Sequence, residues 1–144
     1  MLDDGTVGVL EDANVNPSNL ELWRTWERFR VVDAGNGKIA LHNSFHNRFI
    51  RISGDDVEGF GGSMNACDLP PESEWGCEGF TLVDAGDGKY AFHNSLHNRF
   101  MRMCGSSVDA RGGPRNVDQL PPGWLSEQFE IIPHPIPAPV RLFY

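Results

Sequence analysis

Histidine and asparagine recur together in two short segments, HNSFHN at residues 42–47 and HNSLHN at residues 93–98. Imidazole is the commonest metal ligand and titrates near neutral pH, so the four histidines could hold a metal or sense protons. Asn and His also tolerate turn conformations and cap nearby backbone groups through their side chains. Because no Cys, Asp or Glu recurs at ligand spacing beside these residues, we favour the structural role and expect no metal site.

Each of these segments is followed by two arginines that flank a phenylalanine. An arginine on the outer face of a strand can grip a carboxylate or an aromatic ring of a partner. The alternative is an intramolecular pair with an acidic residue of the same copy, such as Glu58 or Asp109. The candidate interaction residues are therefore His42, Asn43, His46, Asn47, Arg48, Arg51, His93, Asn94, His97, Asn98, Arg99 and Arg102.

Catalytic signals are weak. Ser44 and Ser95 lie beside histidines in the sequence, but adjacency is not a triad, and the chain has no G-x-S-x-G nucleophile elbow. The segments GNGK and GDGK lack the following Ser or Thr of a phosphate-binding loop. We expect a protein without enzymatic activity and without a cofactor.

These segments belong to a longer repeat. VVDAGNGKIALHNSFHNRFIRI at 31–52 recurs as LVDAGDGKYAFHNSLHNRFMRM at 82–103, displaced by 51 residues. A linker with a Leu-Pro-Pro start and a tryptophan follows each copy, ending at Phe80 and Phe129, and a related segment ends at Phe29. Self-similarity at a fixed period indicates one supersecondary unit packed against copies of itself.

The repeat reads as short strands joined by turns. Asn36-Gly37 and Asp87-Gly88 are hairpin signals, because both turn residues must accept positive φ. Alternating polar and apolar residues predict strands over 38–42 and 48–52, and a weaker strand follows. Three such units form a β-trefoil, so we expect a single all-β, β-trefoil-like barrel over residues 1–144. It would comprise a partial repeat (1–30), two repeats (31–80 and 81–132) and a Pro-rich tail with a closing strand (133–144).

In this barrel the third lobe is incomplete or is assembled from both termini. The alternative is an open repeat, or a fragment of a longer array. The predicted core consists of Phe29, Val31, Leu41, Phe49, Phe80, Leu82, Phe92, Phe100 and Phe129.

The composition of the chain limits the classes of partner that it can bind. The net charge of −8 over 144 residues disfavours nucleic acid and anionic lipid, which are found through surplus Lys and Arg. No apolar run approaches the roughly 20 residues that span a bilayer. The three cysteines are odd in number and lack CxxC spacing, which favours reduced thiols over the alternative of one disulfide and one free thiol. We therefore expect an intracellular reducing compartment, cytoplasm or organelle, with any targeting segment absent or removed.

The segments GKIALHNSFHNRFIRI and GKYAFHNSLHNRFMRM resemble the fascin-like, actin-crosslinking β-trefoil superfamily, in which each lobe starts with a Gly-Lys strand and returns through an R-F-x-R-type strand. The resemblance covers most of residues 20–132. It implies a β-trefoil, and for function it implies actin bundlers, membrane-associated switches or lectin-like modules. The HNxxHN motif differs from the turn sequence of actin-bundling members, and the Q-x-W signature of ricin-type lectins is absent.

Similar repeats occur in algal proteins, which leaves open a subunit of an organellar assembly. We expect a non-catalytic protein-interaction or scaffold module docked into a larger, multi-subunit protein assembly. Actin binding and glycan binding are the alternatives.

Overall fold

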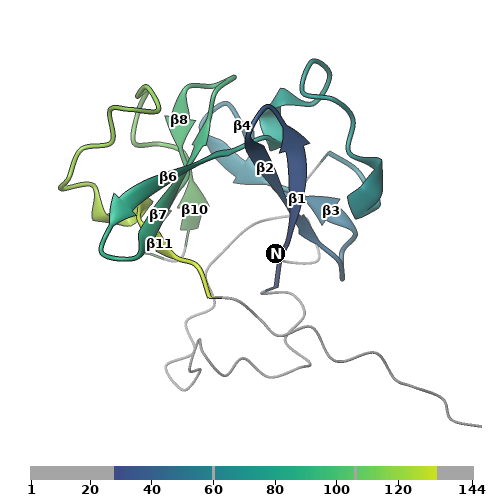
Figure 1. The fold of residues 1–144 in the computed structure, drawn as a ribbon, viewed down its shortest axis with the longest axis horizontal. Coiled ribbons are helices and arrows are strands. Elements are labelled where there is room, and N and C mark those ends of the chain that lie inside the picture. Colours follow the sequence, from purple (N-terminus) through teal and green to yellow (C-terminus); the bar gives the residue numbers. More distant parts are fainter. Residues whose placement is uncertain (1–27, 60, 106, 133–144) are drawn as a thin grey trace, which may run out of the picture.

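The computed structural model describes residues 28–59, 61–105 and 107–132, and within them the chain is all-β (Figure 1). Lobe 1 contains β1 (Arg30–Gly35), β2 (Lys38–Asn43), β3 (Arg48–Phe49), β4 (Arg51–Ser53) and β5 (Asp56–Glu58). Lobe 2 contains β6 (Thr81–Gly86), β7 (Lys89–Asn94), β8 (Arg99–Phe100), β9 (Arg102–Cys104) and β10 (Ser107–Asp109). The strand β11 (Phe129–Glu130) comes last.

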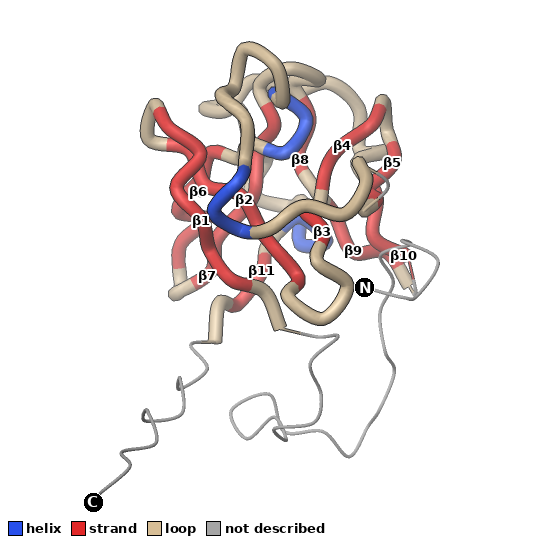
Figure 2. The backbone as a smooth tube through the Cα atoms, turned by 90° about the vertical axis from the view of Figure 1, so that its right-hand side faces the viewer, coloured by secondary structure: helices blue, strands red, loops and turns tan. Residues whose placement is uncertain are grey.

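Two linkers connect these units, linker 1 over residues 61–79 and linker 2 over residues 112–128. They carry three single-turn 3-10 helices, η3 (Ala66–Asp68), η4 (Gly76–Glu78) and η5 (Leu125–Glu127). Figure 2 shows that these helices interrupt the loops and not the strands. Among the described residues, no helix is long and apolar enough to cross a membrane.

The first hairpin of each lobe forms as the sequence predicted. Asn36 and Gly37 have φ values of 54° and 74°, and Asp87 and Gly88 have 53° and 73°. Positive φ at both positions makes the two-residue turn that matches the twist of paired strands. The aspartate three residues earlier steadies each turn, because the Asp33 and Asp84 carboxylates accept the backbone N–H two residues on, at 2.8 Å.

The predicted strand over 48–52 is divided in the structure. β3 pairs with β2, whereas β4 pairs with β5, so the chain changes partner at Ile50. Ile50 is buried, and its N–H donates to the carbonyl of Leu41 at 2.9 Å. The predicted weaker strand that follows is β5. When β3 and β4 are counted as one interrupted strand, each lobe has four strands.

The lobes join through backbone pairing. β5 and β10 pair at Asp56 and Asp109, which makes a four-stranded sheet in the order β4-β5-β10-β9. Phe80, which opens lobe 2, exchanges two backbone hydrogen bonds with Ile39 of β2 at 2.7 and 2.8 Å. β11 pairs with β7 at the equivalent place, through Phe129 and Tyr90.

Two four-stranded lobes and the start of a third, built on a repeat of about 50 residues, make the fold β-trefoil-like, as the sequence predicted. Most of the partial repeat expected over residues 1–30, and all of the tail with its closing strand expected over 133–144, lie outside the described residues.

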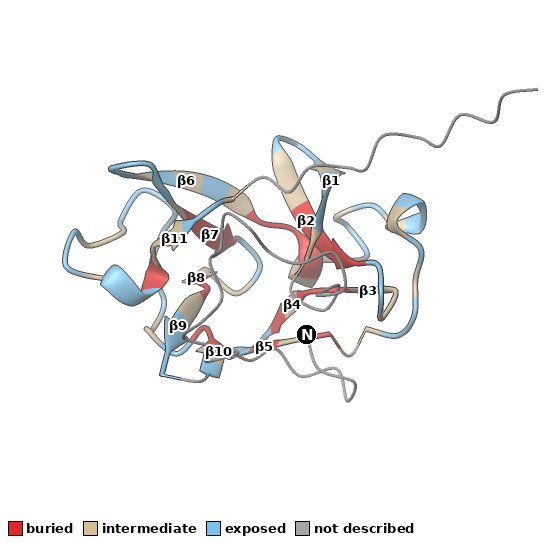
Figure 3. Cartoon of the chain, turned by 90° about the horizontal axis from the view of Figure 1, so that it is seen from below, coloured by how far each residue is buried: buried red, intermediate tan, exposed pale blue. Residues whose placement is uncertain are grey.

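The core lies between the lobes, where β2 and β7 are buried (red in Figure 3). Five predicted core residues are buried, Leu41, Phe49, Phe80, Phe92 and Phe100, and Phe29 and Phe129 pack against them. The prediction was wrong for Val31 and Leu82, which are 58% and 38% exposed. Successive side chains of a strand point to opposite faces, and apolar residues stand on both faces of β1 and β6. The sequence pattern therefore did not show which face is inside.

Candidate functional site: the two HNxxHN turns

The HNxxHN segments form two equivalent turns, turn 1 (residues 44–47) between β2 and β3, and turn 2 (residues 95–98) between β7 and β8. The side-chain oxygen of Asn43 accepts the N–H of His46 at 3.0 Å, and Asn94 does the same for His97. Each turn closes on an asparagine with φ of 52°, a left-handed conformation that this side chain tolerates well. Local side-chain chemistry thus sets the shape of both turns.

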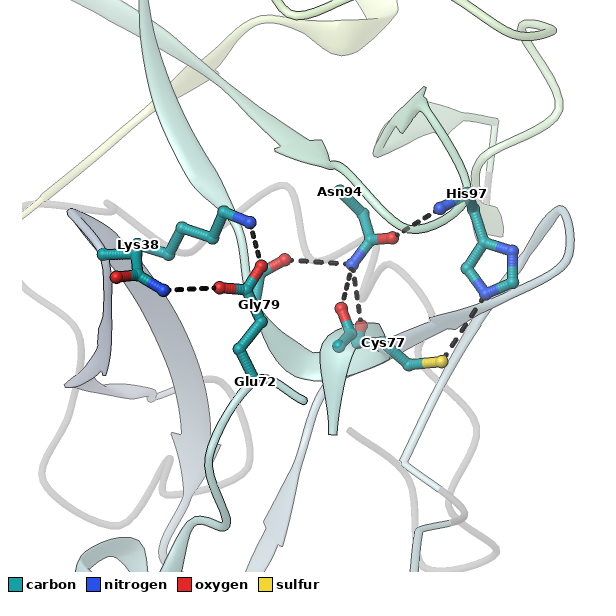
Figure 4. Close-up of polar contacts among 8 residues, drawn as sticks. Lys38, Glu72, Cys77, Gly79, Asn94 and His97 are labelled. Atoms are coloured by element: carbon teal, nitrogen blue, oxygen red, sulfur yellow. Dashed lines mark hydrogen bonds and ion pairs between the residues drawn. The ribbon is translucent and has the colours of Figure 1, made fainter. Parts of the chain in front are cut away.

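The Asn94 carboxamide ties turn 2 to the end of linker 1 (Figure 4). It is fully buried, and its Nδ2 donates to the carbonyls of Gly76, Cys77 and Gly79 at 2.8, 3.2 and 2.9 Å. The equivalent Asn43 is also fully buried, and it donates to the carbonyl of Arg28 at 3.0 Å. Burying a carboxamide without these hydrogen bonds would cost free energy, so each asparagine holds its turn against the segment whose carbonyls it bonds.

The first histidine of each motif points inward and holds the following linker. Nε2 of His42 lies 2.8 Å from the carbonyl of Met64, and Nε2 of His93 lies 2.8 Å from that of Arg115. A carbonyl can only accept, so Nε2 carries the proton in both rings. Nδ1 of each ring is buried and has no hydrogen-bond partner among the described residues. Both imidazoles therefore use Nε2 to hold the chain, which is a structural role.

The last asparagine of each motif completes the attachment to the linker. Asn47 bonds the side chain of Asn65 at 3.0 Å, and Asn98 bonds that of Asn116 at 2.8 Å. Their backbone carbonyls accept the N–H groups of Met64 and Arg115, both at 2.8 Å. Turn and linker are therefore joined by side-chain and backbone hydrogen bonds in each lobe.

The four arginines also bond within the chain. Arg48 and Arg99 donate to the carbonyls of Gly59 and Ala110 at 2.9 and 3.0 Å. Arg51 pairs with Glu58 at 2.7 Å, and Arg102 with Asp109 at 2.5 Å. Burial alone would raise the pKa of Asp109, but the bonds from Arg102 and from a backbone N–H outweigh it and lower that pKa. The intramolecular pairing that the sequence offered for these arginines is present at Glu58 and Asp109.

Two buried glutamates were missed as titratable groups. Glu78 and Glu127 are 3% and 4% exposed, and Oε2 of Glu78 has no hydrogen-bond partner. Burial raises the pKa of both carboxyls, while the charges of Arg51 and Arg102 act in the opposite direction. The sequence shows that these glutamates are part of the repeat, because a glutamate stands two residues before Phe29, Phe80 and Phe129.

One thiol lies beside a turn histidine. Sγ of Cys77 is 3.5 Å from Nε2 of His97 (Figure 4). Burial, followed by the charge of Glu78, raises the pKa of this thiol, so it is neutral. Cys67 and Cys104 are exposed, and none of the three cysteines forms a disulfide. Cys77 and His97 supply two donors, and no group of three potential metal ligands occurs among the described residues.

The turns present one apolar side chain each to solvent. Phe45 is 55% exposed and Leu96 is 63% exposed, at the same position of the motif. The Phe45 ring packs edge-on against that of His46, with centroids 4.9 Å apart, and Leu96 lies over Gly76. These residues were not among the predicted interaction residues, although an apolar residue in the middle of a polar turn is visible in the sequence.

The structure brings the candidate residues together lobe by lobe. In and next to lobe 1, hydrogen bonds or ion pairs are formed by His42, Asn43, Asn47, Arg48 and Arg51. The equivalent residues form such contacts in lobe 2. β3 and β8, which follow the two turns, stand on opposite sides of Figure 1. Among the described residues, no hydrogen bond or ion pair joins turn 1 to turn 2. That these residues bind a partner stays a prediction.

No protein-family model matches the chain, and no curated protein matches it. Among solved structures, it is similar to "SeviL bound to asialo-GM1 saccharide", with 17% identity over 71% of this chain and 69% of that one, at a TM-score of 0.45. A likeness of this size carries no argument about fold or function. The β-trefoil-like description rests on the strand pairing, and membership of the fascin-like superfamily stays a prediction.

Proposed function

We propose that this protein is a non-catalytic binding module that docks onto another protein through the apolar tips of its two HNxxHN turns. The observation that carries the proposal is the shared geometry of Phe45 and Leu96. Both are large and exposed, and each stands on a turn that an asparagine side chain closes, next to an inward-bonded His42 or His93.

Rigid presentation favours binding. Association costs free energy for each side chain and loop that must be ordered, and a turn that is already held in place avoids much of that cost. Buried aromatic and aliphatic anchors commonly supply most of the binding energy of an interface. A scaffold that fixes two such anchors on separate lobes suits a subunit of a larger assembly.

Pairing of basic residues within the chain favours docking through the apolar tips over binding to acidic actin filaments. Actin filaments are acidic, and a chain of net charge −8 would have to collect its cations on one face to meet them. Lys38 is paired with Glu72, Arg51 with Glu58, and Arg48 with a backbone carbonyl. These cations are therefore already satisfied within the chain.

The test is recovery of the native partner with a double variant, Phe45→Ser with Leu96→Ser. We expect partner capture from the native extract to fall about tenfold or more, with the melting temperature unchanged, because both side chains are exposed. Val31→Thr is the matched control, since it makes another exposed apolar side chain polar and keeps its shape. Equal capture by the double variant and the parent protein would contradict the proposal.

A further inference from the structure

A groove lies beside lobe 2, between β6 and linker 2. Its volume is about 250 Å³. Val83, Leu120 and Pro121 line it with half-buried apolar surface, whereas Asp84 and Asp118 are exposed and therefore stand at the rim. Gln128 lines the end next to β11. The groove thus combines an apolar interior with an acidic edge.

Lobe 1 is built differently at the equivalent place. Linker 1 is two residues longer after its Pro-Pro pair, and it carries Glu72 there. The Glu72 carboxylate accepts hydrogen bonds from Asn36 at 3.0 Å and from Lys38, which ties linker 1 to the β1–β2 hairpin (Figure 4). Linker 2 has Gly123 directly after its Pro-Pro pair, so it carries no carboxylate there. Within the described part of the chain, no hydrogen bond or ion pair ties it to the tip of the β6–β7 hairpin.

The polar groups of the groove are available to a ligand. The carboxylate of Asp84 uses one oxygen on its own turn, at the N–H of Gly86. The side chains of Asp118 and Gln128 have no hydrogen-bond partner among the described residues. In a chain of net charge −8, two carboxylates at a rim attract a cation, and half-buried apolar walls suit the aliphatic stem that carries one.

We propose that this groove binds an extended peptide of a partner protein through an arginine side chain. The stem lies on Val83, Leu120 and Pro121, and the guanidinium meets Asp84 and Asp118. The Gln128 carboxamide offers a donor and an acceptor to the peptide backbone. Arginine fits because its planar fork matches carboxylates and its head is weakly hydrated. None of the described residues that line the groove is aromatic, so these residues offer no ring on which a sugar would stack.

The test uses the peptide acetyl-Gly-Leu-Arg-Leu-Gly-amide and a copy with citrulline, which has the same shape and no charge. Amide chemical shifts of the labelled full chain are followed during titration. We expect shifts at residues 83–85 and 117–122, about tenfold weaker binding of the citrulline peptide, and weaker binding at about 0.5 M salt, where exposed charges are screened. No shift at these residues, or equal binding of both peptides, would overturn the proposal.

Variants separate this inference from the proposed function. Asp84→Asn with Asp118→Asn should weaken the arginine peptide about tenfold, whereas Asp33→Asn, the same change in lobe 1, should leave its affinity unchanged. The Phe45→Ser, Leu96→Ser variant should bind the peptide like the parent protein, because the groove consists of other residues. Lactose shifting the groove amides when the peptide does not would replace the peptide with a sugar and overturn the inference.

Discussion

Lobes 1 and 2 share a skeleton of polar contacts and differ in how their linkers are attached. In both lobes an asparagine fixes the turn, a buried histidine holds the linker carbonyl, and an arginine pairs with an acid, at nearly equal distances. Linker 1 is also clamped to the hairpin by Glu72, whereas linker 2 is shorter and leaves a groove there.

Comparing lobe 1 with lobe 2 distinguishes the contacts that serve the shared fold from features that are available for binding. Contacts that recur in both lobes, such as those of His42 and His93, serve the shared fold, because each lobe needs the same turns and crossings. The groove and the Cys77–His97 contact belong to lobe 2 and are not among these shared contacts. They are the places where this chain can differ in what it binds.

The largest expected effect concerns the shared skeleton. Asn94→Ala should lower the free energy of unfolding by about 2–4 kcal/mol, because it removes the bonds to one buried and two half-buried carbonyls and to one N–H. Chemical denaturation measures the change. Ser95→Ala, at the exposed neighbouring position, is the control and should leave stability within about 0.5 kcal/mol. A mild effect of Asn94→Ala would mean that the turn is not what holds linker 1.

The next expected effect distinguishes two equivalent glycines. A methyl group on Gly112 would meet Trp124 at 3.0 Å and Glu127 at 3.1 Å, whereas one on Gly61 would have its nearest neighbours, Trp75 and Glu78, at 3.4 Å and beyond. We expect Gly112→Ala to destabilise the protein by about 1–3 kcal/mol, because the crowded side chains must shift. Gly61→Ala should cost much less. Equal melting temperatures for the two variants would show that linker 2 yields as readily as linker 1.

A smaller effect concerns the buried glutamates that both linkers carry. Their raised pKa values mean that the folded state favours the protonated form, so the stability that they contribute is full below about pH 4 and is lost as pH rises through the raised values. Glu78→Gln with Glu127→Gln should therefore stabilise the protein by about 1 kcal/mol at about pH 8, with the difference vanishing in acid.

Thermal melting across pH measures this difference. Glu74→Gln removes an equal charge from an exposed position and serves as control. Asp109 and Glu72 act in the opposite direction, because their lowered pKa values give stability that is lost as pH falls. A pH profile of the double variant that parallels the parent profile would rule out the buried carboxyls as its source.

The smallest expected effect concerns the clamp of lobe 1. Glu72→Ala should change the free energy of unfolding by about 0.5 kcal/mol or less, since the pair lies at the surface. It should nonetheless raise amide exchange at Gly37 toward the rate at Gly88, because both hairpins would then lack a clamp. Glu74→Ala is the control. Unchanged exchange at Gly37 would show that the clamp does not restrain the hairpin.

Local chemistry explains what could be predicted. Asn36-Gly37 forms a hairpin because of its own backbone preferences, and Asn43 closes a turn with a residue three positions away. The division of the strand at Ile50 and the exposure of Val31 and Leu82 depend on which neighbouring strand and which face each segment meets. The strand partner and the buried face depend on residues far apart in the chain, so the alternation of polar and apolar residues alone could not predict them.

By itself the sequence determined the repeat, the all-β class and the hairpin turns, because these follow from short-range backbone and side-chain preferences. Only the tertiary structure decided which residues reach solvent. The inward bonds of Asn94 and His93 leave Leu96 outside, and β6 and linker 2 come together to form a groove with Asp84 and Asp118 among its lining residues. Burial depends on packing between lobes, and packing is a property of the whole fold.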